Sequence, residues 1–446
     1  MNNSSVLYDD ERCQMGVEGL DNILNGGLPR NRLYLIKGDP GVGKTTLAIQ
    51  FLLQGAKQGE KGLYITLSET SQEIMGVANS HGWDLSPIAL YELTSIEEKI
   101  RNDSESTFFH PSEVELNRTI EALIEEVERV KPARVVFDSL SEMRMLAETP
   151  LRYRRQILQL KQFFAGRQST VLLLDDRTSG MHDLQVESIA HGVISIESTS
   201  PGYGVSRRQL NVLKIRGSQY LEGSHDLVLR KGGMAVFPRL IAGDSHREFA
   251  REDFSSGIGE LDALLGGGLG RGTSTMLMGP PGTGKSTVAI RFALSAAQRG
   301  EKVLLFIFDE TVGTLLNRAS QLGMDLQSHI DAGLINIIPV DPAEISPGEM
   351  AHNIRSAVLK QGAKMIVIDS INGYLNAMPA ERYLTLQLHE LLAFLNQQGI
   401  VTLMVLAQQG LIGSMKSTVD LTYLADTVVL LRYFEARGEV KQAVSV

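Results

Sequence analysis

The chain has 446 residues, and its hydrophobic content of 43% is enough for two globular domains that each bury a core. Its 52 acidic residues outnumber its 43 basic ones, which argues against nonspecific wrapping of nucleic acid because phosphate neutralisation needs a basic surface. The single cysteine, Cys13, excludes an internal disulfide and a thiolate metal cluster, and the lack of a long apolar run or a secretion signal predicts a cytoplasmic protein without a membrane span.

Apolar runs alternate with helix-like segments along the chain. The apolar runs predict buried strands, and the segments with i, i+3, i+4 apolar spacing predict helices. Strands separated by helix-length segments predict an α/β fold in which a parallel sheet is covered on both faces. In the first half, the predicted strands are 32–38, 62–69, 134–140 and 169–176, and the predicted helices are 45–60, 118–131 and 151–167.

The second half of the chain repeats the first. Residues 16–70 align with residues 257–311 without a gap, and nearly half of the aligned residues are identical. Each copy is far longer than the roughly 20 to 50 residues of a solenoid unit, so the repeat is a duplicated domain. We place the boundary in the charged stretch 241–253 and expect domains at 1–245 and 246–446, each a mostly parallel doubly wound sheet.

Two loops, GDPGVGKTT from Gly38 and GPPGTGKST from Gly279, follow apolar runs and open helices. Both have the spacing of a phosphate loop, in which backbone N–H groups and a helix N-terminus surround a phosphate and the lysine contacts the outer phosphates. We therefore predict two sites for ATP with Mg²⁺. The predicted ATP-binding residues are Gly38, Asp39, Pro40, Gly41, Val42, Gly43, Lys44, Thr45, Thr46, Gly279, Pro280, Pro281, Gly282, Thr283, Gly284, Lys285, Ser286 and Thr287.

Two apolar runs end in an aspartate that can serve the metal, Asp138 in VVFDS and Asp369 in MIVIDS. A carboxylate at the end of a parallel strand faces the crevice where ligands bind, and the hydroxyl after the loop lysine completes the Mg²⁺ shell. Alternatively, each aspartate caps the turn that follows it. The predicted metal ligands are Thr45, Asp138, Ser286 and Asp369.

The apolar run after each phosphate-loop helix ends in a glutamate that can orient the attacking water. Glu69 in TLSET and Glu310 in FIFDET are equivalent, and the residue before them is Ser68 in the first copy and Asp309 in the second. The second site therefore has two carboxylates and the first has one. Either glutamate can instead cap a helix. Residues that end a later run at the same face, and can sense the γ-phosphate, are Asp175, Asp176 and Gln408.

Together these motifs resemble the KaiC family, the RecA-like two-domain ATPases of the bacterial circadian clock and their relatives. The resemblance covers essentially the whole chain: the opening pattern G-x-x-x-L-D-x-x-L-x-G-G in both copies, both phosphate loops, HGWDL and LGMDL, and the segment LNVLKIRGSQYLEGSHDLVLRKGGMAVFPR. It implies two tandem RecA-like P-loop domains in a homohexameric ring with ATP bound between subunits. It also implies regulatory protein partners and a Ser/Thr autokinase activity in the second domain.

The resemblance further implies a role for a Lys-x-Arg-Gly motif, which begins here at Lys214 and includes Arg216. In the family this motif reaches the γ-phosphate that the neighbouring subunit holds. Positive charge supplied in trans to a transferring phosphoryl group is worth about 10³- to 10⁵-fold in rate. From the sequence alone, both side chains can equally be ordinary surface charges.

The chain departs from the family pattern in three ways. One of the paired glutamates at the base position is replaced, by Ser68 in the first copy and by Asp309 in the second, and the serine puts hydrolysis at the first site in doubt. Aligning QLNVLKIRG from Gln209 with QAVSV from Gln442 ends the chain at Val446, one position before a second Lys-x-Arg-Gly. The family's phosphorylated Ser and Thr lie beyond that point, so no acceptor residue is carried over.

The leading hypothesis is a Mg²⁺-dependent ATPase that forms nucleotide-bridged rings and switches conformation and partners. One alternative is a RecA-like nucleic-acid motor, against which stand the acidic balance and the lack of a basic run with interleaved aromatics. Another is a scaffold that binds ATP for assembly with little hydrolysis, which Ser68 favours for the first domain. The charged helix-like segment 95–106 can dock a partner or form a solvated face.

Overall fold

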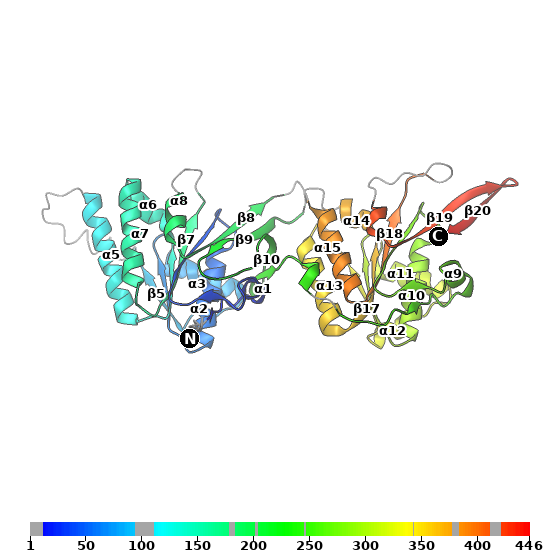
Figure 1. Cartoon of the computed structure of the whole chain (residues 1–446). Coiled ribbons are helices and arrows are strands. Elements are labelled where there is room, and N and C mark those ends of the chain that lie inside the picture. The colour runs from blue at the N-terminus through cyan, green and yellow to red at the C-terminus, as the bar shows by residue number, and fades with distance from the viewer. Residues whose placement is uncertain are drawn as a thin grey trace, which may run out of the picture. The chain divides into compact units, whose positions relative to one another are not determined.

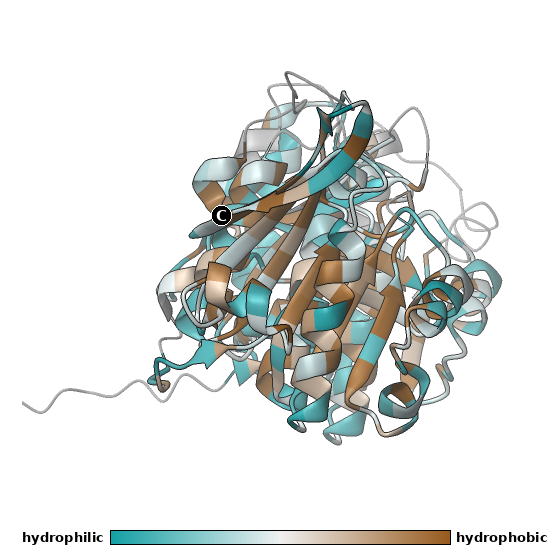
Figure 2. Cartoon of the chain, turned by 90° about the vertical axis from the view of Figure 1, so that its right-hand side faces the viewer, coloured by the Kyte–Doolittle hydropathy of each residue, from teal (hydrophilic) through white to brown (hydrophobic). Residues whose placement is uncertain are grey.

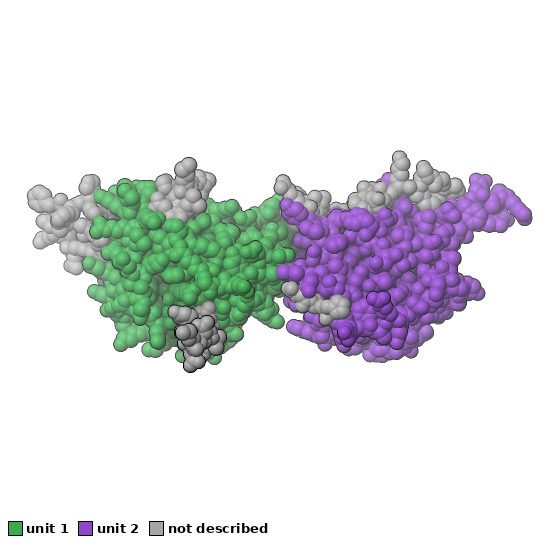
Figure 3. Space-filling view, viewed as in Figure 1, with its two compact units in different colours: residues 1–200, 206–239 green, residues 201–205, 240–446 purple. Residues whose placement is uncertain are grey.

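The computed structural model describes residues 12–93, 111–177, 183–200, 204–244, 247–341, 343–376, 383–410 and 421–446 (Figure 1). The chain forms two compact units (Figure 3). Unit 1 comprises residues 1–200 and 206–239, and unit 2 comprises residues 201–205 and 240–446. The division after Arg239 lies a few residues before the boundary expected from the sequence, and residues 201–205 belong with unit 2.

Unit 1 is built on one large sheet with the described strand order β11-β10-β9-β8-β3-β7-β6-β4-β5. The strands from β8 to β5 in this order are parallel, and β9, β10 and β11 are antiparallel additions at one edge. The strands are β3 (Leu33–Gly38), β4 (Gly62–Thr66), β5 (Ile88–Glu92), β6 (Arg134–Asp138), β7 (Thr170–Asp176), β8 (Gly192–Thr199), β9 (Arg207–Ile215), β10 (Ser224–Arg230) and β11 (Gly233–Phe237), with β1 (Arg12–Cys13) and β2 (Leu28–Pro29) in a small separate sheet.

Helices cover both faces of this sheet because its central strands are apolar on both sides. In β3, Tyr34 and Ile36 pack into the core under α2, whereas Leu33 and Leu35 pack into the core under α5, α6 and α7. The helices are α1 (Glu18–Ile23), α2 (Lys44–Lys57), α3 (Ser71–His81), α5 (Pro111–Val130), α6 (Leu140–Ala147), α7 (Pro150–Phe164) and α8 (Asp183–Ile189).

Unit 2 repeats this plan with the described strand order β16-β15-β17-β18-β14-β19-β20. Only β20 is antiparallel, and Figure 2 shows the hydrophobic residues concentrated in the strands. The strands are β14 (Ser274–Gly279), β15 (Lys302–Ile307), β16 (Ile335–Pro339), β17 (Ala363–Asp369), β18 (Val401–Ala407), β19 (Thr427–Ala436) and β20 (Glu439–Ser445), with β12 (Asp253–Phe254) paired to β13 (Leu269–Gly270). The helices are α9 (Gly259–Leu264), α10 (Lys285–Gln298), α11 (Val312–Gln321), α12 (Gln327–Asp331), α13 (Pro347–Gln361), α14 (Ile371–Asn376) and α15 (Leu384–Gln397), with short 3₁₀ turns η1 (Ala242–Asp244) and η2 (Thr422–Leu424).

The two sheets correspond strand by strand from β5 and β16 at one edge to β9 and β20 at the other. This shared order confirms the prediction of two tandem α/β domains with mostly parallel sheets. The β10–β11 hairpin has no described counterpart in unit 2, and it packs against α1 and α2. Among the described residues, no helix combines the length and the apolar character that crossing a membrane requires.

Candidate active sites

Each phosphate loop joins a central parallel strand to the helix that follows it, β3 to α2 in unit 1 and β14 to α10 in unit 2. Gly43 and Gly284 stand directly before these helices in the left-handed conformation, with φ of 105° and 89°. A side chain at either position would strain the backbone, so glycine is required for the chain to turn from the strand into the helix. Both helix N-termini are thereby presented at the carboxyl ends of the parallel strands, where ligands of such sheets bind.

The loop lysines differ in their partners. The Lys44 ammonium donates to the carbonyls of Gly38 and Asp39 at 2.9 and 3.0 Å and forms an ion pair with the Asp176 carboxylate at 2.8 Å. The Lys285 ammonium donates to the Pro280 carbonyl at 2.7 Å, and burial lowers its pKa. At the strand position equivalent to Asp176, unit 2 has Ala407, because Gly38 lies beside Asp176 and Gly279 beside Ala407.

The predicted metal ligands lie together in each unit. The Thr45 hydroxyl donates to Oδ2 of Asp138 at 3.0 Å, and the buried Tyr64 hydroxyl donates to the same oxygen at 2.5 Å. Burial raises the pKa of Asp138, and the two hydroxyl groups oppose that rise. In unit 2, burial likewise raises the pKa of Asp369, and a hydrogen bond from Ser286 opposes it.

In unit 1, the predicted base Glu69 is half-buried in the turn after β4. The Thr66 hydroxyl accepts from the Glu69 amide at 3.0 Å and donates to the Glu69 carbonyl at 2.7 Å, which fixes the turn. Within the described part of the chain, its carboxylate oxygen Oε2 is buried and has no hydrogen-bond partner. Burial, followed by the charges of Asp138, Glu73 and Asp176, raises the pKa of Glu69. This carboxylate is therefore free to accept a hydrogen bond from a water molecule.

In unit 2, both predicted carboxylates at the base position already have partners. Glu310 forms an ion pair with Arg318 of α11 at 2.7 Å, and Asp309 accepts a hydrogen bond from the Ser370 hydroxyl at 2.5 Å. The second carboxylate that the sequence offers at this site is thus engaged, and the base itself is neutralised. Of the two predicted bases, Glu69 is the one with a buried carboxylate oxygen that has no hydrogen-bond partner among the described residues.

Lys214 and Arg216 lie at the end of the sheet opposite their own phosphate loop. β9 runs antiparallel to β8, so Lys214 pairs with Val193 near the start of β8, whereas Gly38 lies beside Ile196 further along. Lys214 donates to the Glu187 carbonyl, and Arg216 donates to the Ser188 carbonyl at 2.7 Å. Both side chains therefore cap the C-terminal end of α8, three strand positions back from the level of their own phosphate loop.

The pairing of β19 with β20 corrects the sequence alignment of the C-terminal segment. Ser445 lies opposite Leu430, as Asn211 lies opposite the equivalent Ser195 of unit 1. Val446 therefore corresponds to Val212, one residue earlier than the sequence alignment placed it.

The three residues predicted to sense the γ-phosphate have different contacts. Asp176 holds Lys44, while Asp175 forms an ion pair with Arg144 of α6. The Gln408 side-chain oxygen is buried and, among the described residues, has no hydrogen-bond partner. Asp176 is thus the member of this group with a direct contact to a phosphate-loop side chain.

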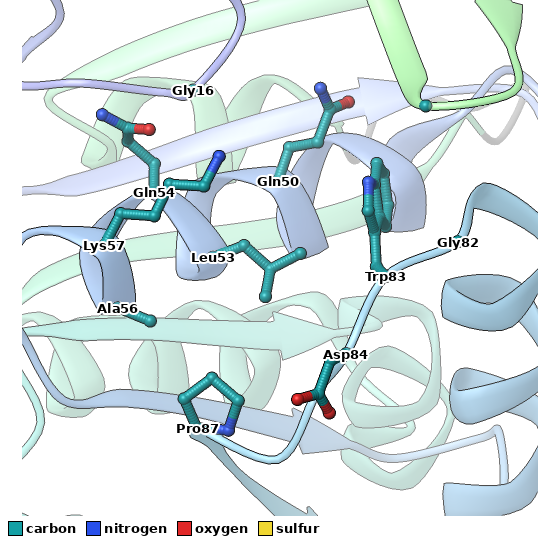
Figure 4. A pocket seen from close by; sticks show the side chains of 11 residues that line it. Gly16, Gln50, Leu53, Gln54, Ala56, Lys57, Gly82, Trp83, Asp84 and Pro87 are labelled. Atoms are coloured by element: carbon teal, nitrogen blue, oxygen red, sulfur yellow. The ribbon is translucent and has the colours of Figure 1, made fainter.

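A pocket of about 500 Å³ lies on the outer face of α2, away from the predicted site residues (Figure 4). Gln50, Gln54 and Lys57 of α2 line one side, and Trp83 and Asp84 line the other. Trp83 is the only tryptophan of the chain, which makes it a reporter of unit 1.

Sequence reasoning missed two side chains that the structure brings to these sites. Tyr64 is a tyrosine at the centre of a fully buried strand, GLYIT, and a polar group in the middle of such a strand is a signal that something polar lies within its reach. Arg318 follows Glu310 by two helical turns, a spacing that does not by itself predict a contact. The segment 95–106, considered above as a docking helix, lies outside the described residues.

Comparison with known proteins decides the family. A family model described as "ATPase: KaiC" matches residues 13–241 and 254–446. The chain belongs to the KaiC family of ATPases. It is 26% identical to the circadian clock oscillator protein KaiC of Synechococcus elongatus over 455 residues, covering 100% of this chain and 86% of that protein. It is also 26% identical to KaiC of Parathermosynechococcus lividus, covering 99% of this chain and 82% of that protein, and to KaiC 1 of Synechocystis sp., covering 98% and 84%.

Membership of the KaiC family confirms the resemblance found in the sequence and supports ATPase activity and nucleotide binding in general. Both family segments contain one of the phosphate loops, which confirms that the repeat is a duplicated KaiC-type domain. Among the described residues there is no cluster of three or more His, Cys, Asp or Glu side chains that could hold a metal ion alone. A phosphate-loop site does not need one, because the nucleotide's phosphates supply part of the metal shell.

Proposed function

We propose that this KaiC-family chain is a Mg²⁺-dependent ATPase whose first unit carries most of the hydrolysis. The observation that carries the proposal is the contrast between Glu69, which has a buried carboxylate oxygen without a partner, and Glu310, which Arg318 neutralises. A general base must accept a proton or hydrogen bond from the attacking water, and a carboxylate that an arginine already holds does so less readily.

The residues of the first site fit a magnesium ion. Oxygen donors are the ligands that Mg²⁺ prefers, and the Thr45 hydroxyl at the start of α2 lies 3.0 Å from the Asp138 carboxylate at the end of β6. In this arrangement Thr45 and Asp138 would hold the ion, and in unit 2 Ser286 and Asp369 would do so. When bound, the ion neutralises charge on the phosphates.

In the proposed mechanism, different residues of the chain bind the phosphates, orient the water and stabilise the transferring phosphoryl group. The backbone of the loop and the N-terminus of α2 hold the phosphates, and Lys44 exchanges the Asp176 carboxylate for the outer phosphates of ATP. Glu69 orients the water that attacks the γ-phosphate. Lys214 and Arg216 act on the loop of a neighbouring chain, since both lie at the far end of their own sheet.

That last role requires assembly, and we propose a nucleotide-bridged homo-oligomer, a hexameric ring as the KaiC resemblance implies. Hydrolysis would switch its conformation and its regulatory partners. For unit 2, the Glu310–Arg318 ion pair favours a second function, nucleotide binding that supports assembly with little turnover. A Ser/Thr autokinase activity of unit 2 stays a weaker proposal, and a nucleic-acid motor is disfavoured by the acidic balance of the chain.

The test follows γ-labelled ATP with Mg²⁺, measuring free phosphate and label on the protein together. We expect Glu69→Gln to lower phosphate release by about 10²- to 10⁴-fold, the usual worth of a general base, and the matched Glu310→Gln to leave most of it. Lys44→Ala and Lys285→Ala compare the two units in the same way, because each removes the lysine that contacts the outer phosphates. We expect Lys44→Ala to cause the larger loss of phosphate release.

Equal losses from the two glutamate variants would contradict the assignment of hydrolysis to unit 1, and no release from the wild type would contradict the ATPase itself. Label that stays on the protein, and that Lys285→Ala removes, would establish the kinase proposal.

A further inference from the structure

The first site has a contact that the second cannot make. Tyr64 lies in the middle of β4 with only 1% of its surface exposed, and its hydroxyl donates to Oδ2 of Asp138 at 2.5 Å. The same oxygen accepts from Thr45 at 3.0 Å. The equivalent residue of unit 2 is Leu305, since Tyr64 pairs with Val136 as Leu305 pairs with Val367.

This contact fixes the carboxylate that faces the proposed metal. A buried carboxylate is held in one orientation when one of its oxygens accepts two hydroxyl hydrogen bonds. The direction of its other oxygen, here Oδ1, is then fixed as well. Groups that orient a metal ligand in this way set metal affinity, and removing one typically costs about 10- to 100-fold. In unit 2, Leu305 has no polar atom with which to hold Asp369.

We propose that Tyr64 is a positioning residue for the magnesium ion of the first site, and that its absence from unit 2 makes the two sites unequal in metal affinity. This inference rests on the proposed function, because it assumes that Asp138 serves a magnesium ion. The first site would then hold Mg²⁺ with its nucleotide at concentrations at which the second does not. Metal supply would thereby select which unit carries a magnesium nucleotide.

Tyr34 provides a matched control for the loss of a buried hydroxyl. It lies in the same sheet, in β3, with 0% of its surface exposed, and its hydroxyl donates to the Pro29 carbonyl at 2.6 Å. Tyr34→Phe and Tyr64→Phe each remove one oxygen from the same core, but only the second changes a contact of Asp138. A general loss of stability would appear in both variants.

The experiment measures binding at the first site without using hydrolysis. Trp83, the only tryptophan, lies in unit 1, and energy transfer from it to a mant-labelled non-hydrolysable ATP analogue reports nucleotide there. The full chain carries Lys285→Ala so that the second loop is silent, and Mg²⁺ is titrated at fixed analogue. We expect Tyr64→Phe to raise the half-saturating Mg²⁺ concentration by about 10- to 100-fold. Tyr34→Phe should not change it, and the affinity for analogue in excess EDTA should be equal in all three proteins.

Tyr64→Leu, which copies the residue of unit 2, should shift the Mg²⁺ titration at least as far as Tyr64→Phe. Equal titrations for Tyr64→Phe, Tyr64→Leu and Tyr34→Phe would overturn the inference while leaving the proposed ATPase intact. If energy transfer from Trp83 to the analogue in the reference protein does not depend on Mg²⁺, both the role of Tyr64 and the proposed Mg²⁺-dependent ATPase are overturned.

Discussion

At the scale of single residues, the two sites differ in which charges are already neutralised. In unit 1, Oε2 of the proposed base Glu69 has no hydrogen-bond partner among the described residues, and the loop lysine Lys44 is paired with Asp176. In unit 2 the base Glu310 is paired with Arg318, and Ala407 stands where Asp176 would be. In the mechanism that we propose, each site must therefore release one paired side chain, Lys44 in unit 1 and Glu310 in unit 2, before it can hydrolyse ATP. At the first site this release is coupled to phosphate binding, because the phosphates compete with Asp176 for the same ammonium group.

This competition predicts that Asp176→Asn tightens nucleotide binding at the first site. The Asp176 side chain is about one third exposed, 36%, so solvent screens the ion pair and it is worth at most about 1 kcal/mol. Its removal should lower the dissociation constant of an ATP analogue about twofold to fivefold, measured by energy transfer from Trp83 in the Lys285→Ala background. Asp175→Asn is the control, because Asp175 pairs with Arg144 instead. Weaker binding in Asp176→Asn would show that Asp176 supports the nucleotide.

At the scale of secondary-structure elements, the β10–β11 hairpin distinguishes the two loops. A Cβ added at Gly43 would meet Leu229 and Met234 of this hairpin at 2.9 and 3.1 Å, whereas one at Gly284 would meet none of the described residues within 4 Å. Gln50 of α2 accepts from the Met234 amide at 2.8 Å. The hairpin therefore covers the first loop and is tied to the helix that the loop begins.

His225 makes the anchoring of this hairpin sensitive to pH. It is fully buried, its Nδ1 accepts from the Arg239 amide at 3.0 Å, and its Nε2 lies 3.1 Å from the Leu221 carbonyl, which fits the neutral ring. Burial lowers its pKa from 6.5, with the Arg239 charge acting in the same direction and Asp226 opposing it. Because the folded pKa is the lower one, the unfolded state binds the proton first, so the stabilisation is complete above the unfolded pKa and is lost as pH falls from there through the folded pKa.

We therefore expect unfolding of unit 1, followed by Trp83 fluorescence, to occur at lower denaturant as pH falls from about 7.5 to about 5.5. His225→Gln cannot titrate, so the difference between wild type and variant should shrink over this range. Subtracting the variant removes the contributions of buried carboxylates such as Asp138 and Asp21, which shift in common. A constant difference across the range would contradict the role given to His225.

How much the sequence could predict also depends on scale. The phosphate loops were predictable because glycine spacing and a following helix are local, and the position of Asp138 beside Thr45 was predictable because the carboxyl ends of parallel strands meet at one edge of the sheet. Tyr64 and Arg318 were not, since each reaches its partner across a strand or a helical turn, and that reach depends on side-chain packing. The β10–β11 hairpin was recognised in the sequence as part of a family segment. Its contact with the first phosphate loop was not predictable, because it joins residues that are far apart in the sequence.

At the scale of the whole molecule, the proposed role of Lys214 and Arg216 requires more than one chain. The motif containing Lys214 and Arg216 lies towards the end of its sheet that is remote from its own loop, which is why we propose that it acts on a phosphate held by another copy. In the single chain, both side chains cap the last carbonyls of α8, together with Lys161, which donates to the Ile189 carbonyl at 2.9 Å. A substitution at Arg216 can therefore lower phosphate release either by removing a cap from α8 or by removing a contact with a neighbouring chain. Lys161→Ala is the control, because it removes a cap from the same helix and leaves Arg216 in place.

If unit 1 hydrolyses ATP at a site that a neighbouring chain completes, as we propose, then mixing two inactive variants should restore phosphate release. Lys44→Ala chains lack a working loop but keep Arg216, and Arg216→Ala chains keep the loop, so each alone should lose about 10³-fold or more of the phosphate release. After dissociation and reassembly together, some interfaces join an intact loop to an intact Arg216. We expect this mixture to regain a substantial fraction of wild-type phosphate release, whereas Lys44→Ala mixed with Glu69→Gln, both altered in the loop-bearing partner, should not. A mixture no more active than the mean of its two components would contradict the completion of the first site by a neighbouring chain.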